Sequence, residues 1–124
     1  DQLDYVVALL PDTPSTLDLI DSAFLRKLAG DSILINAGRG NCVDEEALLT
    51  ALASDRPRHA VLDVFKQEPL PADHAFWSHP KITVTSHSAA RTQTAYVVKV
   101  FADNYQRFVK GHPLHHQVNF ELGY

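Results

Sequence analysis

Ser32-Ile33-Leu34-Ile35-Asn36 is a short apolar run, and the tight loop Ala37-Gly38-Arg39-Gly40 follows it directly. Such a run predicts a β-strand. Asp44 comes next and can cap a helix, with two glutamates in the first turn, where the helix dipole favours anions. The apolar stripe of this helix is Ala47, Leu48, Ala51 and Leu52. Strand, loop and helix in this order indicate one unit of an α/β fold.

The same alternation continues on both sides of this unit. Leu3–Leu10 is nearly all apolar, which predicts a strand buried on both faces, as in a parallel sheet. Further strands are predicted within Arg58–Phe65 and at Lys81–Thr85. Further helices are predicted from Asp21 or Ser22 to Leu28 and, as a long helix, over Ala89–Lys110. We therefore expect an α/β domain with a mainly parallel sheet.

The composition is typical of a folded domain. The chain has 124 residues, the length of one ordinary domain or of part of a larger one. A hydrophobic fraction of 45% with 21% charged residues suits a packed core and argues against disorder. The formal net charge is −4 and no basic block is present, so we expect no nucleic-acid partner. We also expect no membrane partner, because no apolar run approaches the ~20 residues that a membrane span needs.

Cysteine and methionine usage adds two expectations. Cys42 is the single cysteine, so it cannot form a disulfide within the chain, which fits a reducing compartment and a cytoplasmic location. Methionine is absent, and a strand is predicted within the first few residues. We therefore expect the chain to be a segment of a longer protein.

Polar residues gather at the ends of the predicted strands. Arg39 follows the strand at 32–36, Asp63 lies in the third predicted strand with Glu68 close behind it, and His87 follows the fourth. Taken alone, Arg39 and Glu68 could each be an ordinary loop residue, and His87 could be a histidine at the start of a helix. Ligands of α/β sheets bind beyond the carboxyl ends of the strands, so we expect Arg39, Glu68 and His87 to share one crevice.

A histidine, a glutamate and an arginine in one crevice suit the chemistry of a 2-oxo acid. A carboxylate orients an imidazole and favours its protonated form, which makes a proton-transfer pair. A guanidinium holds a carboxylate through two hydrogen bonds and can polarise a neighbouring carbonyl. Reduction of that carbonyl also needs a hydride, which a nicotinamide supplies.

Four motifs, in order, resemble those of the D-isomer-specific 2-hydroxyacid dehydrogenases. Leu9–Pro14 (LLPDTP) resembles the family's LLP-N-TP turn, and Leu34–Asp44 (LINAGRGNCVD) resembles its N-x-small-R-G signature. Leu62–Pro71 (LDVFKQEPLP) is similar to the LDVF-x-x-EP block, and His79–Ala90 is similar to the HP…T-P-H block. Ser86 stands where the family usually has proline, which removes a φ constraint beside His87 and allows looser placement of the histidine.

The resemblance implies roles for individual residues. Arg39 would clamp the substrate carboxylate and polarise the carbonyl, and His87 would be the general acid in reduction and the base in oxidation, with Glu68 as its partner. NADP or NAD would be the cofactor, with Asp63 beside the nicotinamide, and no metal is implied. The cofactor contacts that the resemblance implies are Val7, Leu10, Pro11, Ala37, Gly38, Arg39, Asp63, His87, Ser88 and Ala90.

The resemblance also implies a domain layout. The chain is similar to the C-terminal half of a Rossmann-like, doubly wound NAD(P)-binding domain (residues 1–88). A long inter-domain helix (89–110) and a tail that returns to a substrate domain (111–124) would follow. The G-x-G-x-x-G motif that cradles the pyrophosphate is not among the 124 residues, so we expect the segment alone to bind dinucleotide weakly or not at all. The family is commonly dimeric, which leads us to expect a homodimer.

The subfamily that the chain resembles is that of the bacterial glyoxylate/hydroxypyruvate reductases, because of Trp77–Pro80 and the ending Gln117–Tyr124. The predicted reaction is the NAD(P)H-dependent reduction of a small 2-oxo acid. The alternative is a dinucleotide-sensing or scaffold protein on the same fold that has no turnover. The retained Arg39, Glu68 and His87 argue against that alternative.

Weaker patterns admit other interpretations. Ser86-His87-Ser88 with Asp63 could suggest a hydrolase triad, but no G-x-S-x-G elbow accompanies it. The histidines at 112, 115 and 116 could suggest a metal site, but a flexible surface tail is favoured because no other ligand has suitable spacing. Cys42 is interpreted as a small buried residue, and Trp77 as either a wall of the substrate pocket or a core residue.

Overall fold

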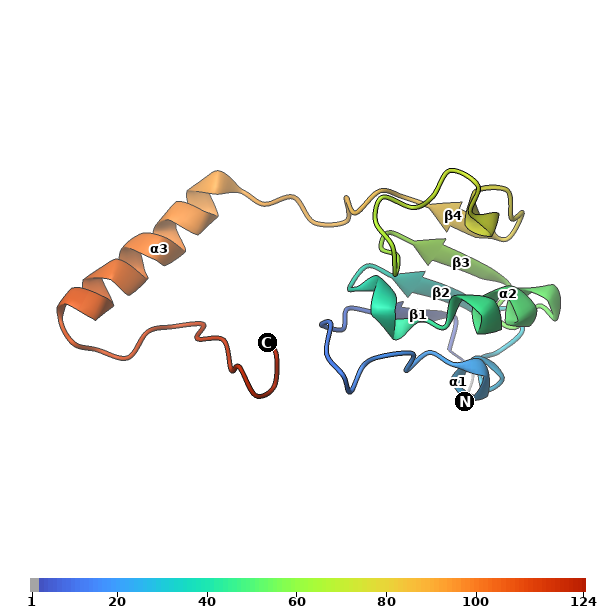
Figure 1. Ribbon diagram of the computed structural model, residues 1–124, viewed down its shortest axis with the longest axis horizontal. Coiled ribbons are helices and arrows are strands. Elements are labelled where there is room, and N and C mark those ends of the chain that lie inside the picture. The colour runs from blue at the N-terminus through green and yellow to red at the C-terminus, as the bar shows by residue number, and fades with distance from the viewer. Residues whose placement is uncertain (1–2) are drawn as a thin grey trace. The chain divides into compact units, whose positions relative to one another are not determined.

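The computed structural model describes residues 3–124. These residues form two compact units that divide between Ala89 and Ala90. The first unit contains a four-stranded parallel sheet in the order β1-β2-β3-β4, which confirms the predicted fold class. Its strands are β1 (Tyr5–Ala8), β2 (Ile33–Asn36), β3 (His59–Leu62) and β4 (Ile82–Val84) (Figure 1).

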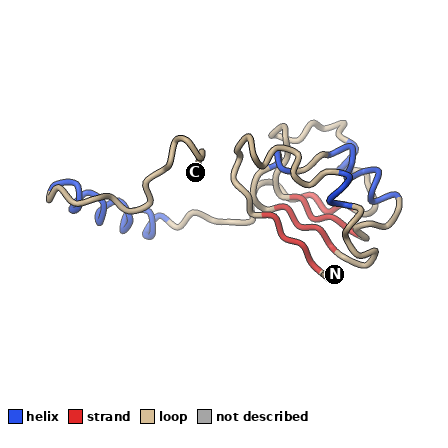
Figure 2. The backbone as a smooth tube through the Cα atoms, turned by 90° about the horizontal axis from the view of Figure 1, so that it is seen from below, coloured by secondary structure: helices blue, strands red, loops and turns tan. Residues whose placement is uncertain are grey.

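Each pair of neighbouring strands is also consecutive in the chain. Two α-helices, α1 (Ser22–Leu25) and α2 (Glu45–Ala53), connect the first three strands. Two 3-10 turns, η1 (Gly40–Cys42) and η2 (Ala75–Trp77), complete the connections. Because parallel crossovers are right-handed, successive connections that proceed in one direction along the sheet cover the same face. Figure 2 shows the helices of this unit gathered on one side of the strands.

The core lies between this covered face and the two helices. Leu34 of β2 and Ala60 of β3 are paired in register, and both are fully buried. They belong to the same core as Leu25 of α1 and Leu48 and Leu52 of α2, which are also fully buried. The opposite face of β1 is open, with Tyr5 62% exposed and Val7 54% exposed. The prediction that the first strand is buried on both faces is therefore wrong for this chain, because the helices of residues 3–89 cover only one face.

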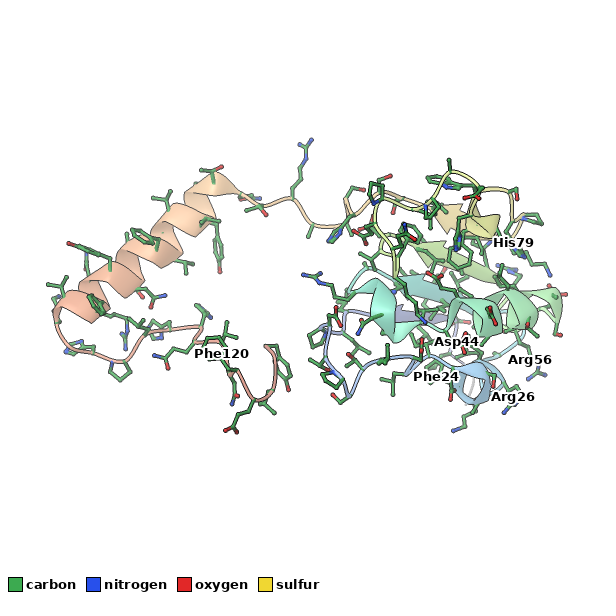
Figure 3. The ribbon with its side chains drawn as sticks, in the orientation of Figure 1. Phe24, Arg26, Asp44, Arg56, His79 and Phe120 are labelled. Atoms are coloured by element: carbon green, nitrogen blue, oxygen red, sulfur yellow. The ribbon has the colours of Figure 1, made fainter. Side chains whose placement is uncertain are left out.

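Both predicted N-caps of the short helices are observed. The Asp21 carboxylate accepts a hydrogen bond from the Phe24 N–H at 2.7 Å, and the Asp44 carboxylate accepts one from the Ala47 N–H at 3.0 Å. Phe24 and Asp44 are labelled in Figure 3. The helix predicted to extend to Leu28 ends as α-helix at Leu25. It continues only as a tighter turn, in which the Leu28 N–H bonds to the Leu25 carbonyl.

The second unit contains α3 (Thr94–Val109) and the tail after it. The predicted start at Ala89 is wrong, because the Ala89 N–H bonds to the Asp63 side chain and the helix begins only after Gln93. Apolar side chains of α3 are exposed, Phe101 by 69% and Phe108 by 70%. The stripe on this helix is therefore not a buried core within its own unit. Within residues 3–124, no helix combines the length and the apolar character that a membrane crossing requires.

Candidate active site

The predicted site residues of the first unit lie in or beyond the strands at the carboxyl edge of the sheet. Close backbone packing joins the loops there. A Cβ on Gly38 would lie 2.6 Å from the Leu10 nitrogen, and one on Gly40 would lie 1.9 Å from the Phe65 carbonyl carbon. Only glycine permits this approach. The loops after β1, β2 and β3 therefore form one continuous surface.

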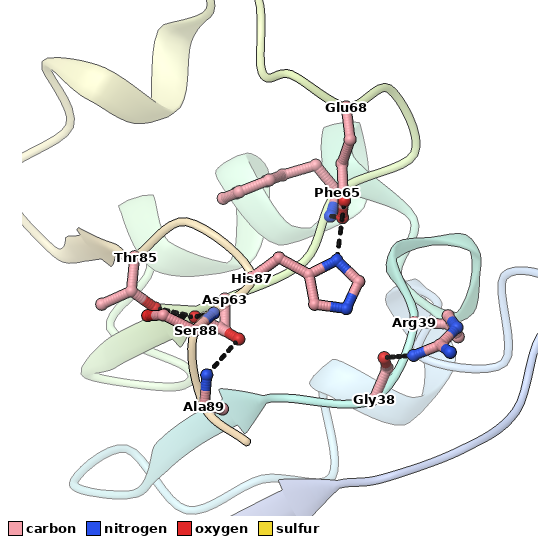
Figure 4. Close-up of polar contacts among 9 residues, drawn as sticks. All are labelled: Gly38, Arg39, Asp63, Phe65, Glu68, Thr85, His87, Ser88 and Ala89. Atoms are coloured by element: carbon pink, nitrogen blue, oxygen red, sulfur yellow. Dashed lines mark hydrogen bonds and ion pairs between the residues drawn. The ribbon is translucent and has the colours of Figure 1, made fainter. Parts of the chain in front are cut away.

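His87 and Glu68 meet on this surface, as Figure 4 shows. The His87 Nδ1 lies 2.8 Å from Glu68 Oε2, so Nδ1–H donates to the carboxylate. The other carboxylate oxygen, Oε1, accepts from the Phe65 N–H at 3.0 Å. The His87 Nε2 bonds to none of residues 3–124, and the side chain is 52% exposed. The pair thus presents one ring nitrogen, backed by a fixed carboxylate, to solvent.

These contacts change the acidity of Glu68. The hydrogen bond from His87 and then the one from the Phe65 N–H hold the pKa of Glu68 below its ordinary value, against a smaller opposing effect of burial. The positive charge of Arg39 acts in the same direction on this pKa. Glu68 is therefore a carboxylate over the physiological pH range.

Arg39 lies on the loop beside the pair and is exposed. Its Nη1 donates to the Gly38 carbonyl at 2.8 Å. The buried Asn36 holds this loop, since its Nδ2 donates to the Arg39 carbonyl at 3.0 Å and its Oδ1 accepts from the Gly38 N–H at 3.2 Å. None of residues 3–124 accepts a hydrogen bond from its remaining guanidinium N–H groups, so these are available to an anion.

Asp63 is a buried residue that lies beyond β3, not within a strand as predicted. β3 ends at Leu62, so Asp63 lies just beyond the strand rather than within it. The residue is only 5% exposed, and its carboxylate accepts hydrogen bonds from Thr85, Ser88 and Ala89. Burial alone would raise the pKa of Asp63, but these hydrogen bonds outweigh burial and lower it.

A cavity of about 460 Å³ adjoins the pair. It is lined by Phe65, Glu68, Pro69, Leu70, Trp77, Ser86 and His87. Trp77 is half exposed, and its indole N–H donates to the Pro71 carbonyl at 2.8 Å. Of the two interpretations of Trp77, the structure supports the pocket wall beside Glu68 rather than a core residue.

The other residues predicted to contact the cofactor occupy several positions. Val7 lies in β1 on the open face of the sheet, Leu10 and Pro11 follow that strand, and Ala37 and Gly38 follow β2. Ser88 follows His87 and is bound to Asp63, whereas Ala90 begins the second unit.

The geometry bears on three of the weaker sequence patterns. The Asp63 carboxylate binds the residues around His87 and not the His87 ring, so the hydrolase arrangement is not formed. Cys42 is buried and donates to the Arg39 carbonyl, and burial raises the pKa of its thiol. In the part of the chain that the structure describes, no three His, Cys, Asp or Glu side chains gather as metal ligands do.

The family model described as "D-isomer specific 2-hydroxyacid dehydrogenase, NAD binding domain" matches residues 1–89. The chain belongs to this family. The predicted family is thereby confirmed, and the four-stranded sheet is part of a Rossmann NAD(P)-binding domain.

Solved structures of 2-hydroxyacid dehydrogenases agree with this assignment. An enzyme of the family from Xanthobacter autotrophicus Py2, in complex with NADPH and MES, is 36% identical with a TM-score of 0.91 over 98% of this chain and 50% of its own. The NADPH-dependent glyoxylate/hydroxypyruvate reductase of Sinorhizobium meliloti, with NADP and sulfate, is also 36% identical, with a TM-score of 0.91 over 98% and 40%. A family protein from Aeromonas salmonicida is 42% identical, with a TM-score of 0.86 over 94% and 38%. The chain thus spans half or less of the length of these proteins.

Sequence reasoning missed several residues of the candidate site. Thr85 and the Phe65 N–H bind the two carboxylates, and Asn36 holds the Arg39 loop. Asn36 carried a usable signal, since a polar residue that ends an apolar strand must find buried partners. Phe65 donates through its backbone N–H, so the identity of its side chain does not indicate this hydrogen bond.

Proposed function

We propose that this chain supplies the substrate-facing half of the cofactor domain of an NAD(P)H-dependent reductase that converts a small 2-oxo acid, of the glyoxylate or hydroxypyruvate type, to the 2-hydroxy acid. The observation that carries the proposal is the 2.8 Å contact between His87 Nδ1 and Glu68 Oε2, which leaves Nε2 free beside a cavity. A proton donor with a fixed ionic partner is what reduction of a carbonyl requires.

The catalytic roles follow from these contacts. His87 Nε2 donates a proton to the oxo oxygen of the substrate, which becomes the hydroxyl of the product. Glu68 keeps the ring in the tautomer and direction that present Nε2, and it stabilises the protonated ring. Arg39 binds the substrate carboxylate with the N–H groups that Gly38 does not use and polarises the carbonyl. When bound, NAD(P)H supplies the hydride.

The cofactor contacts remain part of the proposal. Val7, Leu10 and Pro11, the Ala37–Arg39 loop, Asp63, His87, Ser88 and Ala90 would contact NADP or NAD, with Asp63 beside the nicotinamide. The Sinorhizobium meliloti reductase binds NADP, which favours NADP here. The residues that select between the two cofactors, and those that cradle the pyrophosphate, would lie in a part of the protein outside these 124 residues.

The domain layout and assembly are also proposed from the family. Residues 1–88 form the C-terminal half of the cofactor domain, residues 89–110 connect the two domains, and residues 111–124 return to the substrate domain. We expect a cytoplasmic homodimer. The single buried cysteine is compatible with a reducing compartment.

The test is an assay of the complete protein with glyoxylate and hydroxypyruvate, each with NADPH and NADH, measured by loss of nicotinamide absorbance. We expect turnover, with NADPH preferred, and a loss of about 10²–10⁴-fold in kcat for His87→Ala. Turnover that survives His87→Ala within a few-fold would refute the proton donor. NADPH binding without turnover of any 2-oxo acid would instead support the dinucleotide-sensing alternative.

A further inference from the structure

We propose that Asp63 is a positioning residue for catalysis, which sets the direction of the His87 ring by holding the backbone on both sides of it. The inference rests on the proposed function, because it concerns the residue that donates the proton there. It adds a role to the place beside the nicotinamide that the family resemblance implies for Asp63.

The contacts of Asp63 enclose His87 in the chain. Its Oδ1 accepts from the Thr85 hydroxyl, from the Ser88 N–H at 2.9 Å and from the Ser88 hydroxyl at 3.3 Å. Its Oδ2 accepts from the Ala89 N–H at 2.9 Å. The Asp63 backbone carbonyl accepts from the His87 N–H at 2.7 Å. Asp63 therefore binds the chain just before His87, at His87 itself and just after it.

The backbone of His87 needs such support. Its φ is +49°, in the left-handed region that residues other than glycine rarely adopt. A conformation of this kind persists only where the surroundings enforce it. The preceding residue is Ser86, which has no ring to restrict the chain. The enforcement must therefore come from the flanking contacts, and in residues 85–89 those are largely contacts to Asp63.

Glu68 cannot replace this function. It binds the ring through Nδ1, which fixes the ring only once the backbone has brought His87 within reach. The Asp63 carboxylate touches no ring atom of His87 in the residues that the structure describes. Asp63 therefore acts on direction and distance, and a small error in either is costly, because a misplacement of about 1 Å can reduce a rate about 10²-fold.

The experiment uses Asp63→Asn in the complete protein. The amide keeps the size of the side chain, but its nitrogen cannot accept the hydrogen bonds that the carboxylate accepts. We expect kcat for glyoxylate to fall about 10- to 100-fold while the KM for NADPH stays within about 3-fold. We also expect the NMR signal of the His87 Nδ1 proton, shifted downfield by its bond to Glu68, to weaken or move upfield.

Two further variants make the result decisive. Asp44→Asn changes a carboxylate that also accepts a backbone N–H but caps α2, and it should leave both kcat and the His87 signal unchanged. Thr85→Val removes one bond to Asp63 at nearly constant shape and should lower kcat by about 3- to 10-fold, in case Asp63→Asn does not fold.

The outcomes separate this inference from the proposed function. Unchanged kcat and an unchanged His87 signal in Asp63→Asn, or in Thr85→Val if the former does not fold, would overturn the positioning role. A rise in the KM for NADPH with kcat preserved would also overturn it, because Asp63 would then act on the cofactor alone. If the parent protein reduces no 2-oxo acid, the proposed function fails, and the His87 signal alone still decides whether Asp63 places the ring.

Discussion

Asp63 and Glu68 are two carboxylates on the same short segment, and the structure uses them in opposite ways. Asp63 is almost fully buried and binds the backbone and hydroxyl groups of residues 85–89. The Glu68 side chain is 36% exposed and binds one backbone N–H and one imidazole. Both carboxyl pKa values lie below the ordinary range, yet only Glu68 touches a group with acid–base chemistry.

This difference shows that a lowered pKa does not identify a catalytic carboxylate. A carboxylate that accepts several hydrogen bonds is acidic whether its donors belong to a structural loop or to a reacting ring. What distinguishes the two residues is the nature of the donor and access to solvent. By those criteria we assign Glu68 to the proposed reacting pair and Asp63 to the framework around it.

The largest effect should come from a change that disturbs the segment between the two carboxylates. Gly40→Ala would place a Cβ 1.9 Å from the carbonyl carbon of Phe65, whose N–H binds Glu68. Backbone overlap of this degree should cost about 3 kcal/mol or more in unfolding free energy, measured by urea denaturation. Gly30→Ala is the control, because its nearest neighbour would be at 3.4 Å, an ordinary contact. Equal stability of the two variants would contradict the close packing of these loops.

A smaller effect, specific to the reacting pair, is expected for Glu68→Gln. The amide can still accept from His87 but carries no charge to stabilise the protonated ring. We expect kcat to fall by about 10²-fold, toward the low end of the range for general acid catalysis, with the KM for NADPH unchanged. Urea denaturation should show little change, because a partly exposed ionic contact contributes little to stability. A large loss of stability without a loss of kcat would contradict this assignment, because Glu68 would then support the fold and not the reaction.

The smallest effect is the pH dependence of stability that Asp63 contributes. The pKa of Asp63 is lowered in the folded state, so its contribution is complete above the ordinary carboxyl pKa of about 3.9 and is lost as the pH falls through the folded pKa. Asp63→Asn should therefore be less stable than the parent by about 2 kcal/mol at neutral pH, and the gap should close toward pH 2. A gap that stays constant with pH would show that the charge of Asp63 does not support the loop.

Much of the fold was accessible from local patterns. Apolar runs bounded by turn residues located the four strands, and Asp21 and Asp44 marked helix starts because capping depends on neighbours in the chain. Burial of the outer face of β1 and the start of α3 were predicted wrongly. Both depend on partners distant in the sequence: Tyr5 and Val7 stay exposed, and the Ala89 N–H is bound by Asp63.

The candidate site divides in the same manner. That Glu68 and His87 would lie together follows from the strand-end rule and the family motifs, and the structure places them 2.8 Å apart. The contacts of Asp63 could not be predicted, because they accompany a left-handed backbone at His87 that no residue type there indicates. The Arg39 loop was located from its sequence, but its support by the buried Asn36 is a contact that only the structure shows.

A double-mutant cycle on His87 and Glu68 tests the reacting pair most directly. The measured quantity is kcat for glyoxylate reduction by the complete protein, by His87→Gln, by Glu68→Gln and by the combined variant. If Glu68 acts only through the His87 ring, the combined variant loses no more than His87→Gln alone, within about 3-fold. If the two losses multiply, Glu68 acts independently of His87, and the proton-transfer pair described above does not exist.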